Sequence, residues 1–433
     1  MSQAFTPISS ANSDSSAGKI LSIRGWIFRT RSSGGLAFLV VRDRTGIIQT
    51  TIRRQTVGEE SFQKSSSALI ESAVEVEGEI VADPRAPGGH ELRASRVNVL
   101  APAEVFPIFS DQTEEFLLDK RHLAIRSREL VATMKVKAEV LRAARAFLDS
   151  EGCLEVTPPI MTGNAAEGGS EAFVFDYFGR EAYLGQTAQL YLEALIFPLE
   201  RVYSLTPSFR AEKSRTPRHL TEFMNLEAEM AWAGMAENMD LQERLIASIC
   251  HNVAEKNTEE LKLLGRDPKD LKDIRVPFEK VRYEEAITRL QKLGHDVKFG
   301  SDLGAPEERS LTIDSKSPLF VTHYPKELKA FYMLWSKDDE RTVECDDLLG
   351  PEGYGEMVGG SCRETEIEHL RSALAKQGAK MENYEWYLDL RRYGSVPHAG
   401  FGVGVERVVR WICRREHIRD ATPFPRTPSR VVP

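Results

Sequence analysis

Short apolar runs separated by turn residues dominate the first hundred positions of the chain. The runs are rich in Val, Ile, Leu and Phe, and clusters of Gly, Ser, Asp and Pro stand between them. This alternation predicts strands joined by turns. The predicted strands are Ile20 to Phe28, Leu36 to Val41, Gly46 to Ile52, Val74 to Val81 and Leu92 to Leu100. Five short strands in about 80 residues favour an OB-fold β-barrel.

The rest of the chain mixes helical and strand patterns. From Ser127 to Leu148 apolar residues recur at helical spacing, and Gly152 follows. Ser127 is a favourable N-cap and Gly152 a favourable stop, so we expect a long helix between them. Further helices are expected near Asp240 to Lys256, Tyr283 to Leu293, Glu364 to Gln377 and Glu406 to Arg415. Strand-like runs between these helices indicate an α+β domain.

Composition suggests four segments. Residues 1–18 are rich in Ser and are expected to form a flexible tail. Residues 19–103 would form the barrel, 104–126 a linker, and 127–433 the α+β domain. No apolar run reaches the ~18 residues of a membrane span, and the N-terminus lacks a secretory-signal pattern. Scattered cysteines without CxxC spacing favour free thiols and a cytoplasmic location.

Charge is unevenly distributed along the chain. The net charge of −8 argues against a nucleic-acid partner. Between Lys19 and Arg54, however, eight basic residues accompany a single acidic one, Asp43. A local basic surface can bind phosphates although the whole protein is an anion. A solvated charged face would give the same pattern, so charge alone does not decide between the two.

A strand and the loop before it carry the first candidate chemistry. In Phe223 to Trp232, alternation places Phe223, Glu227 and Glu229 on one face and apolar residues on the other. The preceding loop, Ser208 to Leu220, is rich in Arg, Lys and His, which suits an anionic ligand. The alternatives are acids that face water and an ordinary basic surface loop.

The strongest local signal is HAGFGVGVER, from His398 to Arg407. Its three glycines alternate, so a strand here would have one face without side chains. Glycine weakens a strand, which favours a functional reason: a flat floor for a purine, with Arg407 at the following turn. Asp347 and Glu356 belong to an acidic cluster that could hold Mg²⁺ against phosphates, although such clusters are often only solvated.

Together these stretches resemble the signature motifs of class II aminoacyl-tRNA synthetases. The predicted long helix is similar to motif 1, Ser208 to Glu229 to motif 2, and Gly400 to Arg407 to motif 3. Tyr324 to Tyr332 and Gly355 to Arg363 narrow the resemblance to subgroup IIb, whose N-terminal OB-fold reads anticodons. The resemblance covers nearly the whole chain. It implies ATP and Mg²⁺ as cofactors, tRNA as a substrate, and a homodimer formed around motif 1.

The resemblance also implies roles for individual residues in an ATP site. Arg210 would contact the α-phosphate, and Phe223 would stack on the adenine. Arg407, together with Arg218 or His219, would bind the outer phosphates. Glu356, with Asp347 as helper, would bind Mg²⁺. The remaining implied ATP-binding residues are Glu212, Gly402 and Gly404.

Amino-acid and anticodon sites are implied in the same way. A loop of residues 166–171 would close over the amino acid, with Glu171 and Gln189 holding its α-amino group. Leu192, Glu227 and Arg363 would surround its side chain. In the barrel, the implied anticodon-binding residues are Arg31, Phe38 and Gln49; an aromatic ring and an amide suit a splayed single strand.

Two positions favour asparaginyl over aspartyl members of the subgroup. Aspartyl members resemble Gln-Ser-Pro-Gln-Leu-Tyr-Lys where this chain ends in Leu192, which removes the lysine that would pair with a substrate carboxylate. An unpaired buried carboxylate is costly. Glu227 stands where they usually carry Asp, and its longer carboxylate would accept from an amide and repel an acid. We therefore expect L-asparagine and tRNA(Asn) as substrates, unless Leu192 is a core residue.

Three alternatives remain open at this point. An aspartyl enzyme, including one that charges both tRNAs, would form an adenylate with aspartate. A synthetase-like paralogue that binds tRNA without aminoacylation would have damaged motifs, whereas Arg210, Phe223, Glu356 and Arg407 are all present. An ammonia-using asparagine synthetase on the same catalytic fold would lack the barrel.

Overall fold

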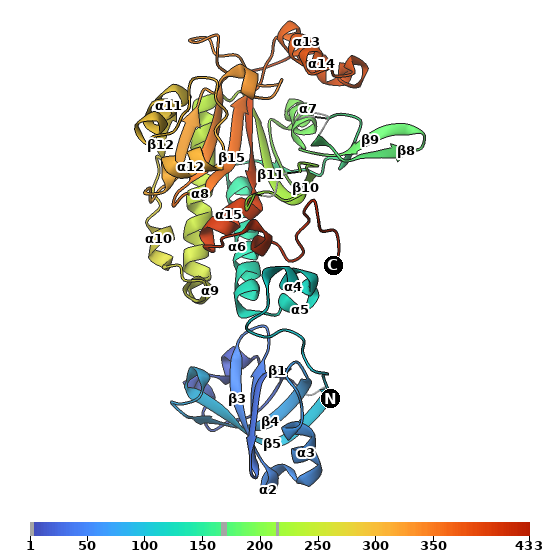
Figure 1. Cartoon of the computed structure of the whole chain (residues 1–433), viewed down its shortest axis with the longest axis vertical. Coiled ribbons are helices and arrows are strands. Elements are labelled where there is room, and N and C mark those ends of the chain that lie inside the picture. Colours follow the sequence, from blue (N-terminus) through green and yellow to red (C-terminus); the bar gives the residue numbers. More distant parts are fainter. Residues whose placement is uncertain (1–3, 166–170, 214–215) are drawn as a thin grey trace. The chain divides into compact units, whose positions relative to one another are not determined.

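The computed structural model describes residues 4–165, 171–213 and 216–433. It divides into two compact units, residues 1–113 and 114–433, each with its own hydrophobic core (Figure 1). The first corresponds to the predicted barrel and the second to the predicted α+β domain. The fold class expected from the sequence is confirmed.

The first unit is a closed barrel with strand order β1-β2-β3-β5-β4. Along β2, Ala37, Leu39 and Val41 are buried inside, while Phe38 and Val40 lie on the outer face. Short helices complete the unit. The bounds are β1 (Ile20–Ser33), β2 (Leu36–Arg42), β3 (Ile47–Arg53), α2 (Arg54–Val57), α3 (Glu59–Ser66), β4 (Ala73–Ala82) and β5 (His90–Ala101). All five predicted strands are present.

The expected flexible tail is instead built into the barrel unit. Helix α1 (Ile8–Ala11) and the turn η1 (Asp14–Ser16) precede β1. Ile8 and Ala11 are fully buried in the barrel core, and the Ile8 N–H donates to Asp43 Oδ2 at 2.9 Å. The prediction of a tail through residue 18 is therefore wrong, because one buried turn of helix is enough to anchor a segment whose composition is otherwise polar.

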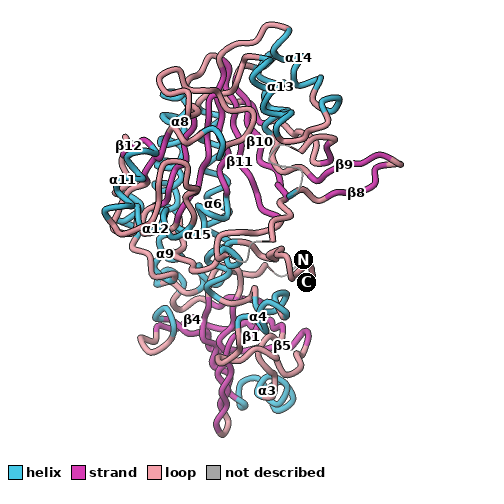
Figure 2. The backbone as a smooth tube through the Cα atoms, turned by 45° about the horizontal axis from the view of Figure 1, so that its top comes forward, coloured by secondary structure: helices cyan, strands magenta, loops and turns pink. Residues whose placement is uncertain are grey.

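The second unit is organised by an eight-stranded sheet with order β12-β13-β14-β15-β16-β11-β10-β6. Most neighbouring strands are antiparallel. The strands are β6 (Leu154–Glu155), β10 (Arg201–Phe209), β11 (Glu222–Ala231), β12 (Glu279–Arg282), β13 (Leu319–Thr322), β14 (Cys345–Gly350), β15 (Gly355–Cys362) and β16 (His398–Gly404). A smaller sheet joins β7 (Met161–Thr162) to a hairpin, β8 (Val174–Tyr177) and β9 (Arg180–Leu184), which projects from the unit (Figures 1 and 2).

Two long helices, α6 (Arg128–Ser150) and α8 (Met235–Lys256), pack together and share one core with the sheet. Ser127 caps α6 as predicted, because its side chain accepts a hydrogen bond from the Leu130 N–H. The other helices are α4 (Glu114–Asp119), α5 (Arg121–Ala124), α7 (Gln189–Leu199), α9 (Thr258–Leu263), α10 (Pro268–Lys272), α11 (Tyr283–Lys292), α12 (Ala305–Thr312), α13 (Ile367–Lys376), α14 (Glu385–Arg392) and α15 (Val405–Ile412).

The expected linker, 104–126, differs from the structure in its second half. Helices α4 and α5 belong to the second unit, which begins at Glu114. Arg121 is buried, and its guanidinium donates to the carbonyl oxygens of Arg419, Thr422 and Pro423. A single buried arginine leaves no periodic pattern in the sequence, so these contacts could not be predicted from the chain.

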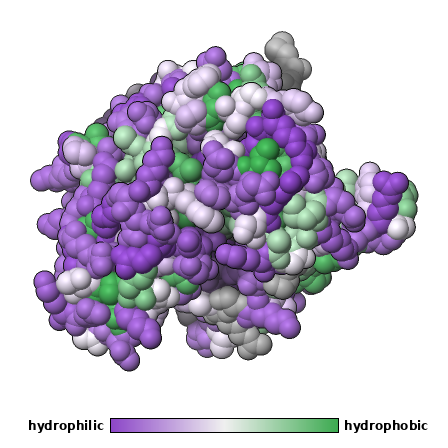
Figure 3. Space-filling view, turned by 90° about the horizontal axis from the view of Figure 1, so that it is seen from above, coloured by the Kyte–Doolittle hydropathy of each residue, from purple (hydrophilic) through white to green (hydrophobic). Residues whose placement is uncertain are grey.

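The surface of the second unit, seen from above, is mostly hydrophilic, with several small apolar areas, one at the base of the projecting hairpin (Figure 3). Within the described ranges, none of the helices combines the length and apolar character that crossing a bilayer requires. All five cysteines are free and buried.

Candidate active site

A cavity of about 430 Å³ lies on the face of the large sheet opposite α6 and α8. Strand β11 shows why. Leu226, Ala228 and Met230 enter the core shared with the two helices, so the alternate residues, such as Glu227 and Glu229, line the cavity. The face assignment made from the sequence is confirmed there. It fails at Trp232, which follows the end of β11 and is 69% exposed.

The alternating glycines of β16 lie against this polar face of β11. Gly400, Gly402 and Gly404 are opposite Glu229, Glu227 and Asn225. Gly402 and Gly404 line the cavity, as expected for a floor.

Gly400 has a different task. A Cβ at this position would lie 2.0 Å from Glu229 Oε2, so only glycine leaves room for that carboxylate.

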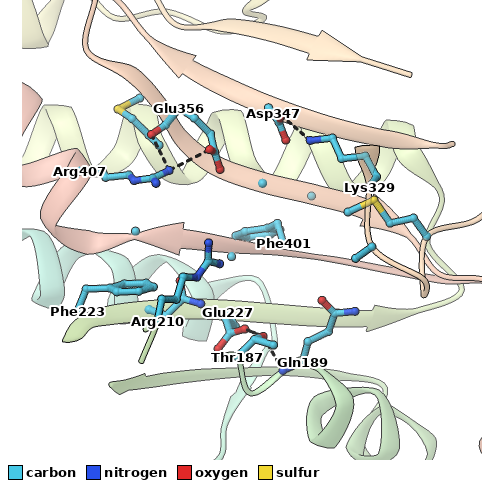
Figure 4. Close-up of a pocket in the computed structure, with 18 of the residues that line it drawn as sticks. Thr187, Gln189, Arg210, Phe223, Glu227, Lys329, Asp347, Glu356, Phe401 and Arg407 are labelled. Carbon is cyan, nitrogen blue, oxygen red and sulfur yellow. Dashed lines mark hydrogen bonds and ion pairs between the residues drawn. The ribbon is translucent and has the colours of Figure 1, made fainter. Parts of the chain in front are cut away.

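One end of the cavity gathers the residues expected to bind ATP, and we call it the phosphate end. Phe223, Arg210, Arg407 and Glu356 lie there (Figure 4). The Arg210 guanidinium is 5.7 Å from the Phe223 ring centre, and Arg407 Nη1 is 3.0 Å from Glu356 Oε2. Burial opposes ionisation of Glu356, but the nearby cations, Arg407 first, lower its pKa to about 2.

The basic loop contributes Arg218 and His219 to the same end. Burial, reinforced by Arg407 and Arg218, lowers the pKa of His219 to about 4, so at neutral pH it is not a cation. Arg218 donates to Glu308, a buried residue of α12 whose carboxylate also accepts the Glu356 N–H at 2.7 Å. Of the two residues considered for the outer phosphates, Arg218 therefore supplies the charge.

Glu212 is the predicted ATP-binding residue that the cavity lining does not include. Its carboxylate lies 3.7 Å from both Arg210 Nη1 and His219 Nε2. In this structure it contacts the site through these two side chains. Its role in ATP binding remains a prediction.

The carboxylates expected to bind Mg²⁺ lie beside Gly359. A Cβ there would be 3.5 Å from Glu356 Oε1 and 3.7 Å from Asp347 Oδ1, so the glycine leaves the space between them open. Two hard oxygen ligands facing one small space fit Mg²⁺. Lys329 Nζ is 2.6 Å from Asp347 Oδ2. Burial opposes the Lys329 charge, but Asp347 keeps the lysine pKa above its usual value.

The opposite end, which we call the amino-acid end, is formed by the start of α7 and the middle of β11. Gln189 and Glu227 line it, as predicted (Figure 4). Glu227 accepts hydrogen bonds from the Thr187 hydroxyl and, at 2.9 Å, from the Ala188 N–H. These two hydrogen bonds hold the Glu227 carboxylate in the cavity lining.

Arg363, predicted to donate to the substrate side chain, is locked to Glu229. Its Nε and Nη2 donate to the two Glu229 carboxylate oxygens at 2.9 and 2.8 Å, and Nη1 donates to Ser361 Oγ at 2.6 Å. The two charged side chains are only 4% and 1% exposed. Burial opposes the arginine charge, but Glu229 raises the pKa of Arg363 above its ordinary value.

Leu192, predicted as an amino-acid-binding residue, is not in the cavity lining. It is fully buried in a small apolar cluster with Ala188, Ile196 and Val202. The alternative of a core residue is therefore correct, because position 192 faces the sheet from α7.

Glu171 is exposed, and its backbone oxygen accepts the Ala211 N–H. Its described contacts do not bring it into the cavity. The rest of the loop expected to close over the amino acid, residues 166–170, lies outside the described residues.

The three anticodon candidates lie on the outer face of the barrel. Arg31 and Phe38 are opposite each other on β1 and β2, with the guanidinium 4.4 Å from the ring centre. Gln49 lies on the same face of β3. Its side-chain amide donates to buried Glu91 at 3.2 Å, and the Thr51 hydroxyl donates to the same oxygen at 2.6 Å.

Lys329 and Glu308, the partners of Asp347 and Arg218, were not identified from the sequence, and neither was the pairing of Glu229 with Arg363. Lys329 lies in Tyr324 to Tyr332, the stretch that indicated subgroup IIb. A cation between apolar residues there could have been recognised as a candidate site residue. Glu229 shares its strand face with Glu227 and was seen there. Glu308 comes from a different helix, and only the tertiary fold brings it to Arg218.

Comparison with known proteins gives a family match for each of the two units. Residues 21–100 match the family described as OB-fold nucleic acid binding domain, and residues 113–428 match tRNA synthetases class II (D, K and N). An asparagine–tRNA ligase of Thermococcus kodakarensis is 48% identical over 96% of both chains.

Solved structures give the same result. The asparaginyl-tRNA synthetase of Pyrococcus horikoshii complexed with asparaginyl-adenylate is 46% identical, with a TM-score of 0.96 over the full length of both chains. The Entamoeba histolytica asparaginyl-tRNA synthetase is 30% identical, with a TM-score of 0.88 over 96% of this chain and 97% of that one. The chain with this cavity thus belongs to the class II aminoacyl-tRNA synthetases of the aspartate, lysine and asparagine group.

Proposed function

We propose that the protein is an asparagine–tRNA ligase, which activates L-asparagine with ATP and transfers it to tRNA(Asn). The choice of amino acid rests on two cations that line the cavity, because each is already paired with a carboxylate of the protein. Arg363 is paired with Glu229, and Lys329 with Asp347. Neither offers an uncompensated charge to a substrate carboxylate, while Glu227 places a carboxylate group in the lining.

A carboxamide suits this end of the cavity better than a carboxylate. Its NH₂ group can donate to Glu227, and its oxygen can accept from the guanidinium edge of Arg363 without needing a net positive charge. Aspartate would bring a second negative charge beside Glu227. The residues that favour asparagine are thus Glu227 and the paired Arg363 and Lys329, and Leu192 has no part in the selection.

The phosphate end supports adenylate formation. In the first step, an oxygen of the asparagine carboxylate bonds to the α-phosphorus of ATP, the bond to the β-phosphate breaks, and pyrophosphate leaves. Arg210 would hold the α-phosphate, and Arg218 and Arg407 the outer phosphates, so the protein positions the reactants and stabilises the charge that develops.

In the second step, a ribose hydroxyl of the tRNA terminal adenosine attacks the adenylate carbonyl and AMP leaves with the phosphate. No protein nucleophile takes part in either step. Glu356 and Asp347 would hold Mg²⁺, which supplies additional positive charge for the phosphates when bound.

The barrel would bind the anticodon through its outer face. Phe38 offers a ring for stacking, and Gln49, whose NH₂ is engaged by Glu91, offers its carbonyl oxygen to a base. Replacing Phe38 by Ala should weaken tRNA charging and leave ATP–pyrophosphate exchange unchanged. A loss of exchange activity would contradict a role confined to the barrel.

We infer a homodimer in the cytoplasm. Apolar side chains are exposed around β6, β7 and the projecting hairpin: Leu154 at 52%, Met161 at 55%, Val174 at 55% and Phe178 at 90%. Exposed apolar surface of this extent is typical of protein interfaces. Free cysteines agree with a reducing compartment. Light scattering of the intact protein tests the dimer, and the mass of a monomer would overturn it.

The amino acid that the enzyme attaches tests the proposed function. The protein is incubated with tRNA, ATP, Mg²⁺ and an equimolar mixture of asparagine and aspartate, and the esterified amino acid is identified by mass spectrometry after mild hydrolysis. Asparagine is the expected product. Aspartate alone would make the protein an aspartyl enzyme, a mixture would make it non-discriminating, and no product would favour the non-aminoacylating alternative.

A further inference from the structure

A buried glutamate, Glu193, lies directly behind Gln189 on helix α7. The two residues are one helical turn apart, and the Gln189 side-chain NH₂ donates to Glu193 Oε1 at 3.0 Å. Gln189 lines the cavity, whereas Glu193 is fully buried behind it. The contact therefore connects the amino-acid end of the cavity to a charge in the protein interior.

The other oxygen of Glu193 contacts three side chains from two distant segments. Arg391 Nη2 lies at 2.6 Å, the Tyr387 hydroxyl at 2.7 Å and His398 Nε2 at 3.1 Å from Oε2. Burial opposes ionisation of Glu193, but Arg391 and His398 keep its pKa below the ordinary value. Glu193 is thus an ionised, immobile acceptor.

Glu193, Glu229 and His398 lie close enough together to suggest a metal site, with their ligand atoms within 4.8 Å of one another. The contacts argue against this. Arg391 neutralises Glu193, and Arg363 neutralises Glu229 through two hydrogen bonds. A cation placed between these carboxylates would meet two guanidinium groups that already balance their charge.

The contact between Gln189 and Glu193 fixes the orientation of the Gln189 amide. Because a carboxylate accepts hydrogen bonds and cannot donate them, only the NH₂ group of Gln189 can face Glu193. Oε1 of Gln189 is then the atom available to the cavity. A carbonyl oxygen accepts from an ammonium group, and an amino acid substrate carries an α-ammonium group.

We propose that Glu193 is a positioning residue that holds Gln189 with its carbonyl oxygen toward the α-ammonium group of the substrate. The proposal rests on the proposed function, since it takes asparagine as the substrate. It assigns Glu193 to substrate binding although it does not itself contact the cavity. A rotated Gln189 would present its NH₂ group to a cation and repel it.

The test is Glu193→Gln, assayed by ATP–pyrophosphate exchange. A glutamine has one acceptor oxygen in place of two, so it cannot accept from Gln189 and also from Arg391 and Tyr387, and Gln189 is free to rotate. We expect KM for asparagine to rise about tenfold, with kcat and KM for ATP nearly unchanged. A purely structural role would lower kcat and raise both KM values together.

An analogue of asparagine without the amino group sharpens the test. 3-Carbamoylpropanoate keeps the carboxylate and the carboxamide, and its inhibition constant against asparagine reports binding without the ammonium contact. Glu193→Gln should leave this inhibition constant within about twofold of the wild-type value, while it weakens the binding of asparagine. Equal weakening of both ligands would overturn the proposal.

Two further variants keep the result interpretable. Tyr387→Phe removes one donor from Glu193 Oε2 but leaves the Gln189 contact, so KM for asparagine should change far less than in Glu193→Gln; an equal change would contradict the proposal.

In a double-mutant cycle, Glu193→Gln should add little to Gln189→Ala, because both remove the same contact. Multiplying effects would show that Glu193 does not act through Gln189.

Should Glu193→Gln fail to fold, Glu193→Gln combined with Arg391→Gln removes the unpaired buried charge, and the same shift in asparagine KM is expected. Wild-type exchange with asparagine separates the two claims. If wild type does not use asparagine, the proposed function is wrong. If wild type uses it and Glu193→Gln behaves as Tyr387→Phe does, only the role of Glu193 is wrong.

Discussion

The phosphate end and the amino-acid end of the cavity both contain paired charges, but the pairs differ in exposure. At the phosphate end, the Arg407 and Glu356 side chains are 19% and 33% exposed. At the amino-acid end, Arg363 and Glu229 are 4% and 1% exposed. A partly exposed pair can exchange its partner for a ligand at modest cost, whereas separating a buried pair leaves an uncompensated charge.

This difference in exposure indicates different roles for the two ends of the cavity. The phosphate end can release Arg407 to a triphosphate, so it responds to the ligand. The amino-acid end keeps its charges fixed, so it selects among ligands. Variants at the first end should therefore change the reaction rate or the use of ATP, and variants at the second should change which amino acid is used.

The largest effect is expected for Arg210→Ala at the phosphate end. Adenylate formation should fall by about a thousandfold, because a cation that stabilises charge in the transition state is lost. Single-turnover formation of the adenylate measures it, and unchanged thermal unfolding serves as the control for folding. A near-normal rate would show that Arg210 does not contact the reacting phosphate.

At the amino-acid end, Glu227→Gln should weaken discrimination. Removing the negative charge beside the substrate should raise the ratio of kcat/KM for aspartate to that for asparagine by about 10- to 100-fold. Glu222→Gln, an exposed residue of the same strand, is the matched control. If the ratio is equal in both variants, the charge of Glu227 does not select the substrate.

A smaller effect is expected for Glu308→Gln, which weakens the support of Arg218. KM for ATP should rise about three- to tenfold, with KM for asparagine unchanged, because a charged acceptor is replaced by a neutral one. Glu307→Gln on the same helix keeps its capping contact with Gly304 and is the control. Equal increases in both KM values would mean that Glu308 supports the fold and not the phosphate end.

The smallest effect concerns pH and His219. Burial, followed by Arg407, lowers its pKa to about 4 from 6.5. Between these values the unfolded chain binds the proton and the folded chain does not, so the free energy of unfolding falls as pH decreases from 6.5 toward 4. His219→Asn should lessen this fall in urea unfolding experiments. A difference from wild type that does not vary with pH would contradict the assignment.

The sequence predicted the elements whose signal is local. The strands of the barrel, the cap at Ser127 and the alternation along β11 depend on neighbours in the chain, and these agree with the structure. The residues expected at the phosphate end line it, apart from Glu212. Gly400, the first glycine of the predicted floor, instead makes room for Glu229.

What the sequence did not predict depends on tertiary contacts. Whether Leu192 faces the cavity or the core is set by the rotation of α7 against the sheet, which no pattern in the chain records. The pairing of Glu229 with Arg363 joins β11 to the residue that follows β15, across β16. The burial of Ile8 depends on a barrel formed by later residues, and its polar neighbours concealed it.

The central claim is that this cavity accepts a carboxamide because two of its lining cations, Arg363 and Lys329, are neutralised by Glu229 and Asp347. ATP–pyrophosphate exchange with the wild-type protein, measured with asparagine and aspartate in parallel, tests it most directly. We expect kcat/KM for asparagine to exceed that for aspartate by at least about a hundredfold. Exchange with aspartate at an equal or higher kcat/KM would contradict the claim.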